Sequence, residues 1–87
     1  MIEYRLKHPV DGQKGRIEVI RLRRPTFKDM KSIGGLKKDM PEEDMMDMMG
    51  KLISRLSGVP NEDVDSLDFE DYVKLAETIG GFFPETR

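Results

Sequence analysis

Near its C-terminal end the sequence gathers oxygen-bearing side chains of the kind that bind Ca²⁺. They are Asn61, Asp63, Asp65, Asp68, Glu70 and Asp71. A calcium loop of the EF-hand type needs Gly at its sixth position and a bidentate Glu at its twelfth. Starting the loop at Asn61 puts Ser66 and Tyr72 there, and starting it at Asp63 fails in the same way. The pattern therefore favours helix capping and a solvated acidic surface over a metal site.

Other catalytic chemistry has little to draw on. The chain contains no Cys and a single His, His8, so it lacks the usual ligand sets for zinc. His8 is also the one histidine that could act as the base of a nucleophilic catalytic site. The spacing of Gly12 and Gly15, and the pair Gly34-Gly35, match no phosphate-binding loop. We therefore expect a protein that is not an enzyme and that uses no cofactor and no metal.

Charge is distributed unevenly along the chain. The net charge is −2, but residues 1–38 hold eleven Lys/Arg against four Asp/Glu, and residues 39–87 hold four against thirteen, so the two parts carry +7 and −9. Such blocks can attract each other within one fold or steer two partners to two faces, and both interpretations stay open. The candidate for nucleic-acid binding is the basic strand with Arg16, Arg21, Arg23 and Arg24, followed by Lys28 and Lys31. It has only Phe27 nearby as an aromatic stacking platform, and the whole chain is acidic, so we expect no nucleic-acid binding.

The composition is typical of a small domain from a reducing compartment. Apolar and charged residues each make up 37% of the 87 residues, and a domain of this size without Cys cannot be a disulfide-stapled secreted scaffold. The N-terminus lacks the apolar stretch of a signal peptide, and no run approaches the ~18 apolar residues of a membrane span. We expect a soluble, cytoplasmic protein that does not associate with membranes.

Residues 2–23 predict an antiparallel β-hairpin. Ile2, Tyr4 and Leu6 alternate with charged residues, as in a half-buried strand. Asp11-Gly12 is a strong signal for a two-residue turn, and a turn there pairs Leu6 with Ile17 and Tyr4 with Val19 on one face. Beyond Val19 the apolar positions change phase, which predicts a bulge near residues 19–21 or burial of both faces.

Three or four helices are predicted after the hairpin, over residues 27–33, 41–57, 61–66 and 69–79. Their start signals are Thr26 with Asp29 as a capping box, Asp39 or Met40 as the cap before Pro41 in the first helical position, Pro60, and Asp68. Their stop signals are Gly34-Gly35, Gly58 and Gly80-Gly81. The expected fold is α+β, one domain with an N-terminal hairpin (1–24), a helical part (26–80) packed as a small bundle, and a tail (81–87).

The feature with most information is a methionine cluster, because four of the seven Met fall between positions 45 and 49. At about 100° per residue they form, with apolar residues farther along the helix, a stripe about 160° wide. Met repacks around partners of varied shape, so the stripe is either core covered by the hairpin or a partner-binding face. Phe82-Phe83 either fold back on the core or form a docking tail. The predicted partner-binding set is Met45, Met46, Met48, Met49, Leu52, Ile53, Leu56, Phe82 and Phe83.

Several segments between Tyr4 and Tyr72 resemble one known family. They are Leu6…Pro9…Gly12, Arg23-Arg24-Pro25-Thr26…Asp29, Ile53…Leu56-Ser57-Gly58-Val59-Pro60, and Leu67…Asp71-Tyr72. Together they resemble the small tail assembly chaperones of Mu-like contractile-tailed phages and prophages. None of these segments is a catalytic motif, and the methionine cluster lies outside them.

The resemblance implies a non-enzymatic chaperone that binds the tape-measure protein and keeps this long, largely helical client soluble while the tail assembles. It also implies a protein of the bacterial host cytoplasm that is absent from the mature virion; self-association is a further possibility. Two other classes stay open. A structural tail or baseplate subunit would favour a rigid, β-rich surface, and a small nucleic-acid-binding regulator would place its arginines on one exposed face.

Overall fold

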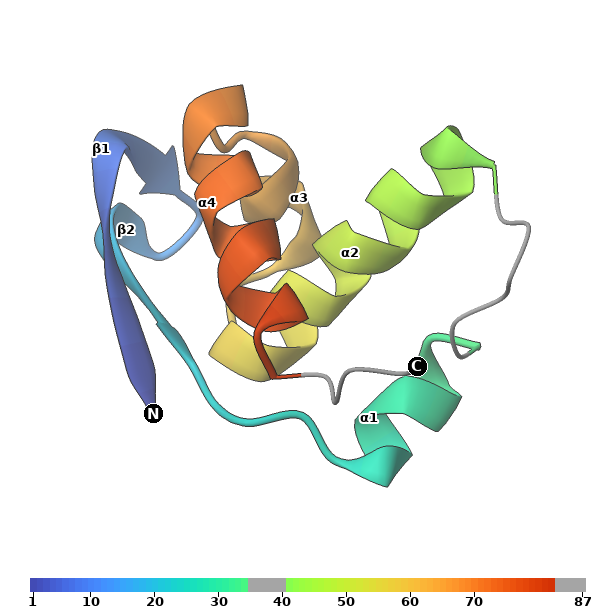
Figure 1. Cartoon of the computed structure of the whole chain (residues 1–87). Helices are drawn as coiled ribbons and strands as arrows, with labels where there is room; N and C mark the ends of the chain where they lie inside the picture. Colours follow the sequence, from blue (N-terminus) through green and yellow to red (C-terminus); the bar gives the residue numbers. More distant parts are fainter. Residues whose placement is uncertain (35–40, 83–87) are drawn as a thin grey trace.

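The computed structural model describes residues 1–34 and 41–82, and within them it has the predicted α+β fold (Figure 1). Two antiparallel strands come first and four helices follow. The elements are β1 (Ile2–Gly12), β2 (Gly15–Leu22), α1 (Phe27–Ser32), α2 (Glu42–Ser57), α3 (Asn61–Asp65) and α4 (Phe69–Gly80). None of the helices in these residues has the length and apolar composition needed to cross a membrane.

The hairpin turns two residues later than predicted. Gly12 pairs with Gly15, so the turn is Gln13-Lys14 and not Asp11-Gly12, and Val10 is the partner of Ile17. The turn prediction was wrong because a distant helix decides the register. The backbone N–H of Gln13 donates to the Asp63 carboxylate of α3, at 3.3 and 3.2 Å. This tertiary contact outweighs the local turn preference of Asp-Gly.

The predicted bulge exists on the other strand. Arg5 pairs with Val19 and Val10 with Ile17, so β1 holds four residues between these positions where β2 holds one. The bulge therefore lies in residues 6–9 of β1 and not in residues 19–21. Tyr4 consequently pairs with Ile20, and the predicted pairs Leu6–Ile17 and Tyr4–Val19 do not form.

Most helix ends follow the local signals. Thr26 and Asp29 form a capping box on α1, the Asp68 side chain accepts the Glu70 N–H at the start of α4, and Gly58 ends α2 with a φ of 81°. Pro41 is the N-cap of α2 and not its first residue. The predicted caps Asp39 and Met40, the stop residue Gly35 and most of the tail, including Phe83, lie outside the described residues.

The core lies between one face of the hairpin and helices α2, α3 and α4. Its buried members are apolar residues from both strands and all three helices: Leu6, Val10, Ile20, Leu22, Leu52, Ile53, Leu56, Val64, Leu75 and Ile79. In Figure 1, α4 lies beside the hairpin, and the first turns of α2 extend away from it. The helix α1 lies apart from the hairpin in the same view.

Candidate partner-binding surface

The methionine stripe is divided between core and surface along the axis of α2. Met48 is 5% exposed, and it is followed by the buried Leu52, Ile53 and Leu56, whereas Met49 is partly buried against the core. Met45 and Met46, in the first turns, are 44% and 43% exposed. Of the four Met in the cluster, Met45 and Met46 are therefore the two that α2 leaves exposed.

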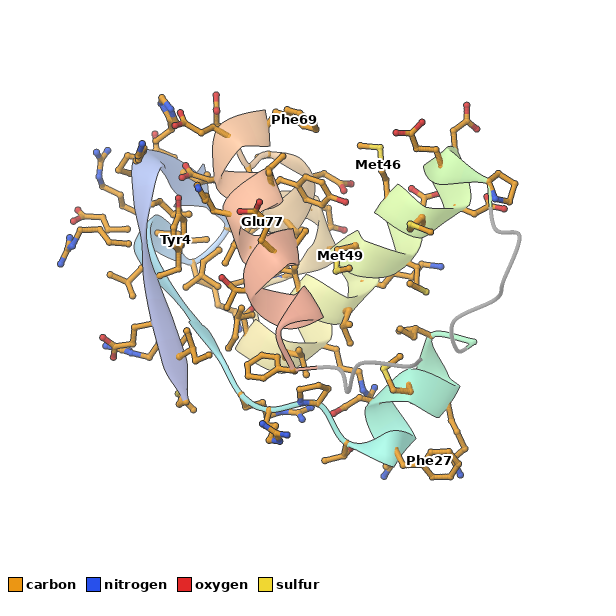
Figure 2. The ribbon with its side chains drawn as sticks, in the orientation of Figure 1. Tyr4, Phe27, Met46, Met49, Phe69 and Glu77 are labelled. Carbon is orange, nitrogen blue, oxygen red and sulfur yellow. The ribbon has the colours of Figure 1, made fainter. Side chains whose placement is uncertain are left out.

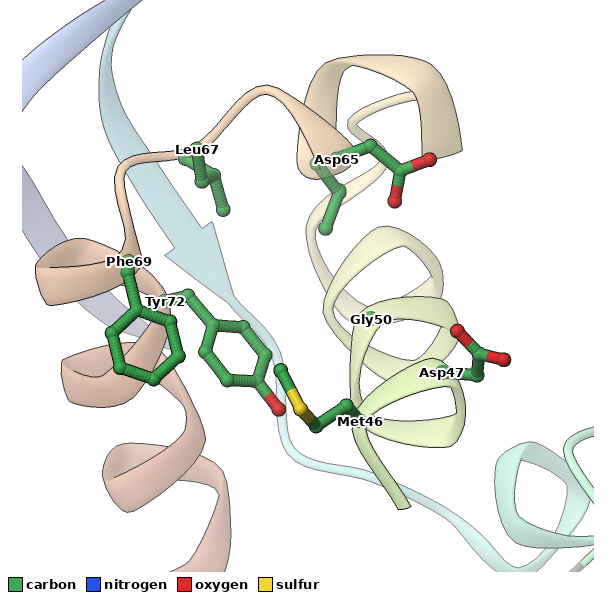
Figure 3. Close-up of a pocket in the computed structure, with 8 residues that line it drawn as sticks. Met46, Asp47, Gly50, Asp65, Leu67, Phe69 and Tyr72 are labelled. Carbon is green, nitrogen blue, oxygen red and sulfur yellow. The ribbon is translucent and has the colours of Figure 1, made fainter. Parts of the chain in front are cut away.

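An open groove of about 230 Å³ begins at Met46 (Figure 3). Its apolar lining comes from all three core helices and the connection between α3 and α4: Met46, Gly50, Val64, Leu67, Phe69 and Tyr72. The rings of Phe69 and Tyr72 stack with centroids 5.9 Å apart, and the Met46 side chain points toward Tyr72. Phe69 is 65% exposed, so this wall of the groove presents an aromatic ring to solvent.

The sequence analysis did not identify this wall. Phe69 and Tyr72 are three residues apart at the start of a helix, which places them on the same face. A second signal is Gly50, because glycine within a helix is unfavourable. Figure 2 shows Met46 and Phe69 at the same end of the molecule, whereas the exposed Phe27 of α1 lies at the opposite end of this view.

Phe82 packs partly against the core, and the Arg24 guanidinium lies 5.9 Å from the centre of its ring. This arrangement corresponds to the folded-back alternative for Phe82. Phe83, its predicted partner in a docking tail, lies outside the described residues.

Two acids predicted to face solvent are buried instead. Asp71 is 0% exposed and accepts three hydrogen bonds, from the Tyr4 hydroxyl (2.7 Å) and from the backbone N–H groups of Lys7 and His8 (3.0 Å each). The two N–H groups belong to the bulge in β1, so Asp71 fixes that irregular segment against α4. Asp63, 6% exposed, receives the N–H of Gln13 in the turn. Pattern alone could not reveal these partners, because they lie about 50 or more residues away.

These contacts change the acidity of the groups involved. Burial would raise the pKa of Asp71, but the hydrogen bonds from Tyr4 and the two backbone N–H groups outweigh it, and the pKa lies below its usual value. The hydrogen bond to the Asp71 carboxylate, together with burial, raises the pKa of Tyr4 to about 12. Asp71 is therefore ionised at neutral pH and acts as an acceptor for all three donors.

Asp29 plays a similar structural role for α1. Its carboxylate is 2% exposed. It accepts hydrogen bonds from both Nη atoms of Arg23 (2.7 and 2.8 Å), from Nε of Arg55 (2.6 Å) and from the Thr26 N–H (2.8 Å). The Arg23 hydrogen bonds are the main reason that the pKa of Asp29 lies far below its usual value. The Arg-Arg-Pro-Thr…Asp segment of the sequence therefore joins β2, α1 and α2 and presents no free arginine at position 23.

One exposed cluster has the residue types of a metal site. His8, Asp68 and Glu70 can bring one ligand atom each to within 4.8 Å of one another. The same atoms already form ion pairs, with His8 Nε2 3.2 Å from Glu70 and 3.6 Å from Asp68. The hydrogen bond to Glu70 raises the pKa of His8, and hydrogen bonds from Lys7 and then His8 lower the pKa of Glu70. These exposed ion pairs account for the cluster without a metal.

Comparison with known proteins identifies a family. The family model described as "Phage tail assembly chaperone proteins, E, or 41 or 14" matches residues 3–84, which span the hairpin and all the described helices. No curated protein and no solved structure matches the chain.

Proposed function

We propose that this chain, which belongs to the phage tail assembly chaperone family, acts in tail assembly by binding the tape-measure protein and keeping it soluble. The observation that carries the proposal is the family match over residues 3–84, which includes both the hairpin and the helices. The protein acts by binding and not by catalysis, in the cytoplasm of the bacterial host, and does not remain in the mature virion.

The structure supports a binding role through its exposed apolar side chains. Met45, Met46 and Phe69 are each more than two-fifths exposed, and Met46 and Phe69 lie at the same end of the molecule (Figure 2). Exposed apolar surface that is grouped in one place tends to mark an interaction site. Methionine adapts its shape to different neighbours, which suits a client with many similar segments.

The two competing classes receive less support. A structural subunit with a β-rich assembly surface does not fit the described residues, whose strands form one two-stranded hairpin. A nucleic-acid-binding regulator needs free arginines on one face. Arg21 instead pairs with Glu3 (2.8 Å), Arg16 with Glu18 (3.2 Å), and Arg23 with Asp29 (2.7 Å).

Co-expression tests the proposal. The tape-measure protein from the same phage or prophage should be recovered in the soluble fraction, and in a complex with this chain, only when the two are produced together. Equal solubility without this chain, with no complex on size-exclusion chromatography, would overturn the proposal. Recovery of this chain in purified tails at a fixed ratio to the tube subunit would instead favour the structural class.

A further inference from the structure

The floor of the groove is a residue without a side chain. Gly50 lies in the interior of α2, where glycine is a poor helix former. A Cβ built on Gly50 would meet only Val64 Cγ1, at 3.9 Å, which is an ordinary contact. Packing therefore does not require glycine here, and its effect is to leave the space between α2 and α3 open.

This space continues beyond the first groove. A neighbouring hollow of about 350 Å³ shares Met46, Asp47, Gly50 and Asp65 with it and extends toward Asn61 at the start of α3. The lining residues come from helices and from the α3–α4 connection, so the groove offers no strand edge to which a peptide could add as a further strand. Among the common modes of peptide recognition, a helix that lays its apolar side chains into a groove suits a lining built from helices, and it suits a client that is itself largely helical.

The rim of the groove is acidic. Asp47 and Asp65, both exposed, line it from α2 and α3, across the groove from Phe69 (Figure 3). The first turn of α2, just before Met46 in the sequence, also carries Glu42, Glu43 and Asp44, and Lys51 is the basic residue that lines the neighbouring hollow. A partner that fills the apolar floor and complements this rim carries Lys or Arg beside its apolar side chains.

We infer that the groove between α2, α3 and α4 binds an amphipathic helix of the client whose apolar stripe is flanked by basic residues. This inference rests on the proposed function and specifies where the client binds and with what chemistry. Met46, Phe69 and Tyr72 contact the apolar side chains of the client helix, which lie over Gly50. Asp47 and Asp65 pair with the basic residues that flank these side chains on the client.

A second copy of this chain is a poorer occupant. Its exposed bases are divided between the hairpin, where Arg21 and Arg16 already pair with Glu3 and Glu18, and the other elements. The basic segment with an exposed apolar side chain, at Phe27, is a helix of six residues in which Lys31 already lies 5.1 Å from the centre of the ring. Apart from the N-terminal Met1, the one large apolar residue that the described hairpin exposes strongly is Ile2, at 42%. A hairpin-to-groove contact would also be heterologous, so it would form rings or open-ended chains and not the common two-fold dimer.

The test measures binding of overlapping peptides that tile the tape-measure protein, and of the whole tape-measure protein, to the full-length chain by fluorescence anisotropy. Gly50→Leu fills the floor of the groove and should weaken binding about tenfold or more. Gly80→Leu is the matched control, because Gly80 is also helical and a Cβ there meets nothing within 4 Å. It should leave the affinity unchanged.

A second pair of variants tests the rim. Asp47→Asn with Asp65→Asn should weaken binding several-fold and reduce its salt dependence. Asp11→Asn with Glu18→Gln removes the same charge from the hairpin and should do neither. Thermal unfolding of every variant shows whether it folds, and if Gly50→Leu does not, the rim variants decide the question.

Each outcome separates the two proposals. If neither the peptides nor the whole tape-measure protein binds the wild-type chain, the proposed function fails, and this inference fails with it. If the client binds wild type, folded Gly50→Leu and the rim variant equally, the groove inference is overturned while the proposed function stands. If Gly50→Leu abolishes self-association but leaves client affinity unchanged, the occupant is a second copy, which also overturns the inference.

Discussion

Replacing Asp71 by Asn is expected to destabilise the protein by about 1–3 kcal/mol. The tyrosine hydroxyl of residue 4 and the Lys7 N–H both donate to Oδ1, and the His8 N–H donates to Oδ2 (3.0 Å). The introduced amide can place its one oxygen at the Oδ1 position and keep two of these bonds. Its NH₂ group then faces the N–H of His8, so one charged acceptor is lost and two donors oppose each other.

Urea denaturation monitored by circular dichroism measures this loss. Glu77→Gln on the same helix is the control, because the Glu77 side chain is 66% exposed and its change should stay within about 0.5 kcal/mol. Tyr4→Phe, alone and combined with Asp71→Asn, should show a coupling of at least about 0.5 kcal/mol. If Asp71→Asn costs no more than Glu77→Gln, Asp71 does not hold the bulge against α4 and this reasoning is refuted.

The same residue gives a prediction for pH. Because the pKa of Asp71 is lowered in the folded state, its contribution is fully present above the ordinary value of 3.8 and is lost as the pH falls below it, through the folded pKa. Asp29 has a lowered pKa as well and acts in the same direction. Asp71→Asn should therefore lose less stability than wild type between pH 5 and pH 2. If the free energy of unfolding fell with pH equally steeply in both proteins, this prediction would be wrong.

Three further predictions concern other positions. Met48→Ala should lower the free energy of unfolding by about 2–5 kcal/mol, because Met48 is 5% exposed. Met46→Ala, at a position 43% exposed, should lower it by under about 1 kcal/mol and weaken client binding. Urea denaturation measures the stability of both variants, and fluorescence anisotropy measures their client binding. Gly12→Ala should destabilise the fold, because its Cβ would lie 2.7 Å from Asp63 Oδ2. Gly50→Ala should stabilise it by up to about 1 kcal/mol, because alanine is the better helix former and its Cβ has room. The opposite outcome in urea denaturation would argue against both packing arguments. Micromolar Ca²⁺ or Zn²⁺ should leave the melting temperature unchanged, and a rise of several degrees that His8→Ala removes would reveal a metal site at His8, Asp68 and Glu70.

What could be predicted from the sequence is what local chemistry decides. The capping box of Thr26 and Asp29, the left-handed Gly58 and the cap at Asp68 are set by neighbouring residues, and all were predicted correctly. The turn and the bulge of the hairpin are set by Asp63 and Asp71, far along the chain, so strand alternation could not locate them.

The methionine stripe shows the same limit in another form. A helical projection gives the direction in which Met45 and Met48 point around the axis, but not how far along the axis the neighbouring helices reach. Met45 lies near the middle of the predicted stripe and is 44% exposed, whereas Met48 lies at its edge and is 5% exposed. Where α3 and α4 end against α2 is a property of the assembled fold, which no single helix encodes.

The residues that carry the family resemblance have structural roles here. Arg23, Thr26 and Asp29 join α1 to β2 and α2, Gly58 ends α2, and Asp71 holds the bulge of β1. Leu67 and Tyr72, which line the groove, belong to these segments. Three other lining residues lie outside them, on the N-terminal part of α2: Met46, Asp47 and Gly50. If the client binds as inferred, the segments shared with the family maintain the scaffold while this part of α2 sets the choice of client. Exchanging residues 45–50 between two family members should then exchange client preference without a large change in stability.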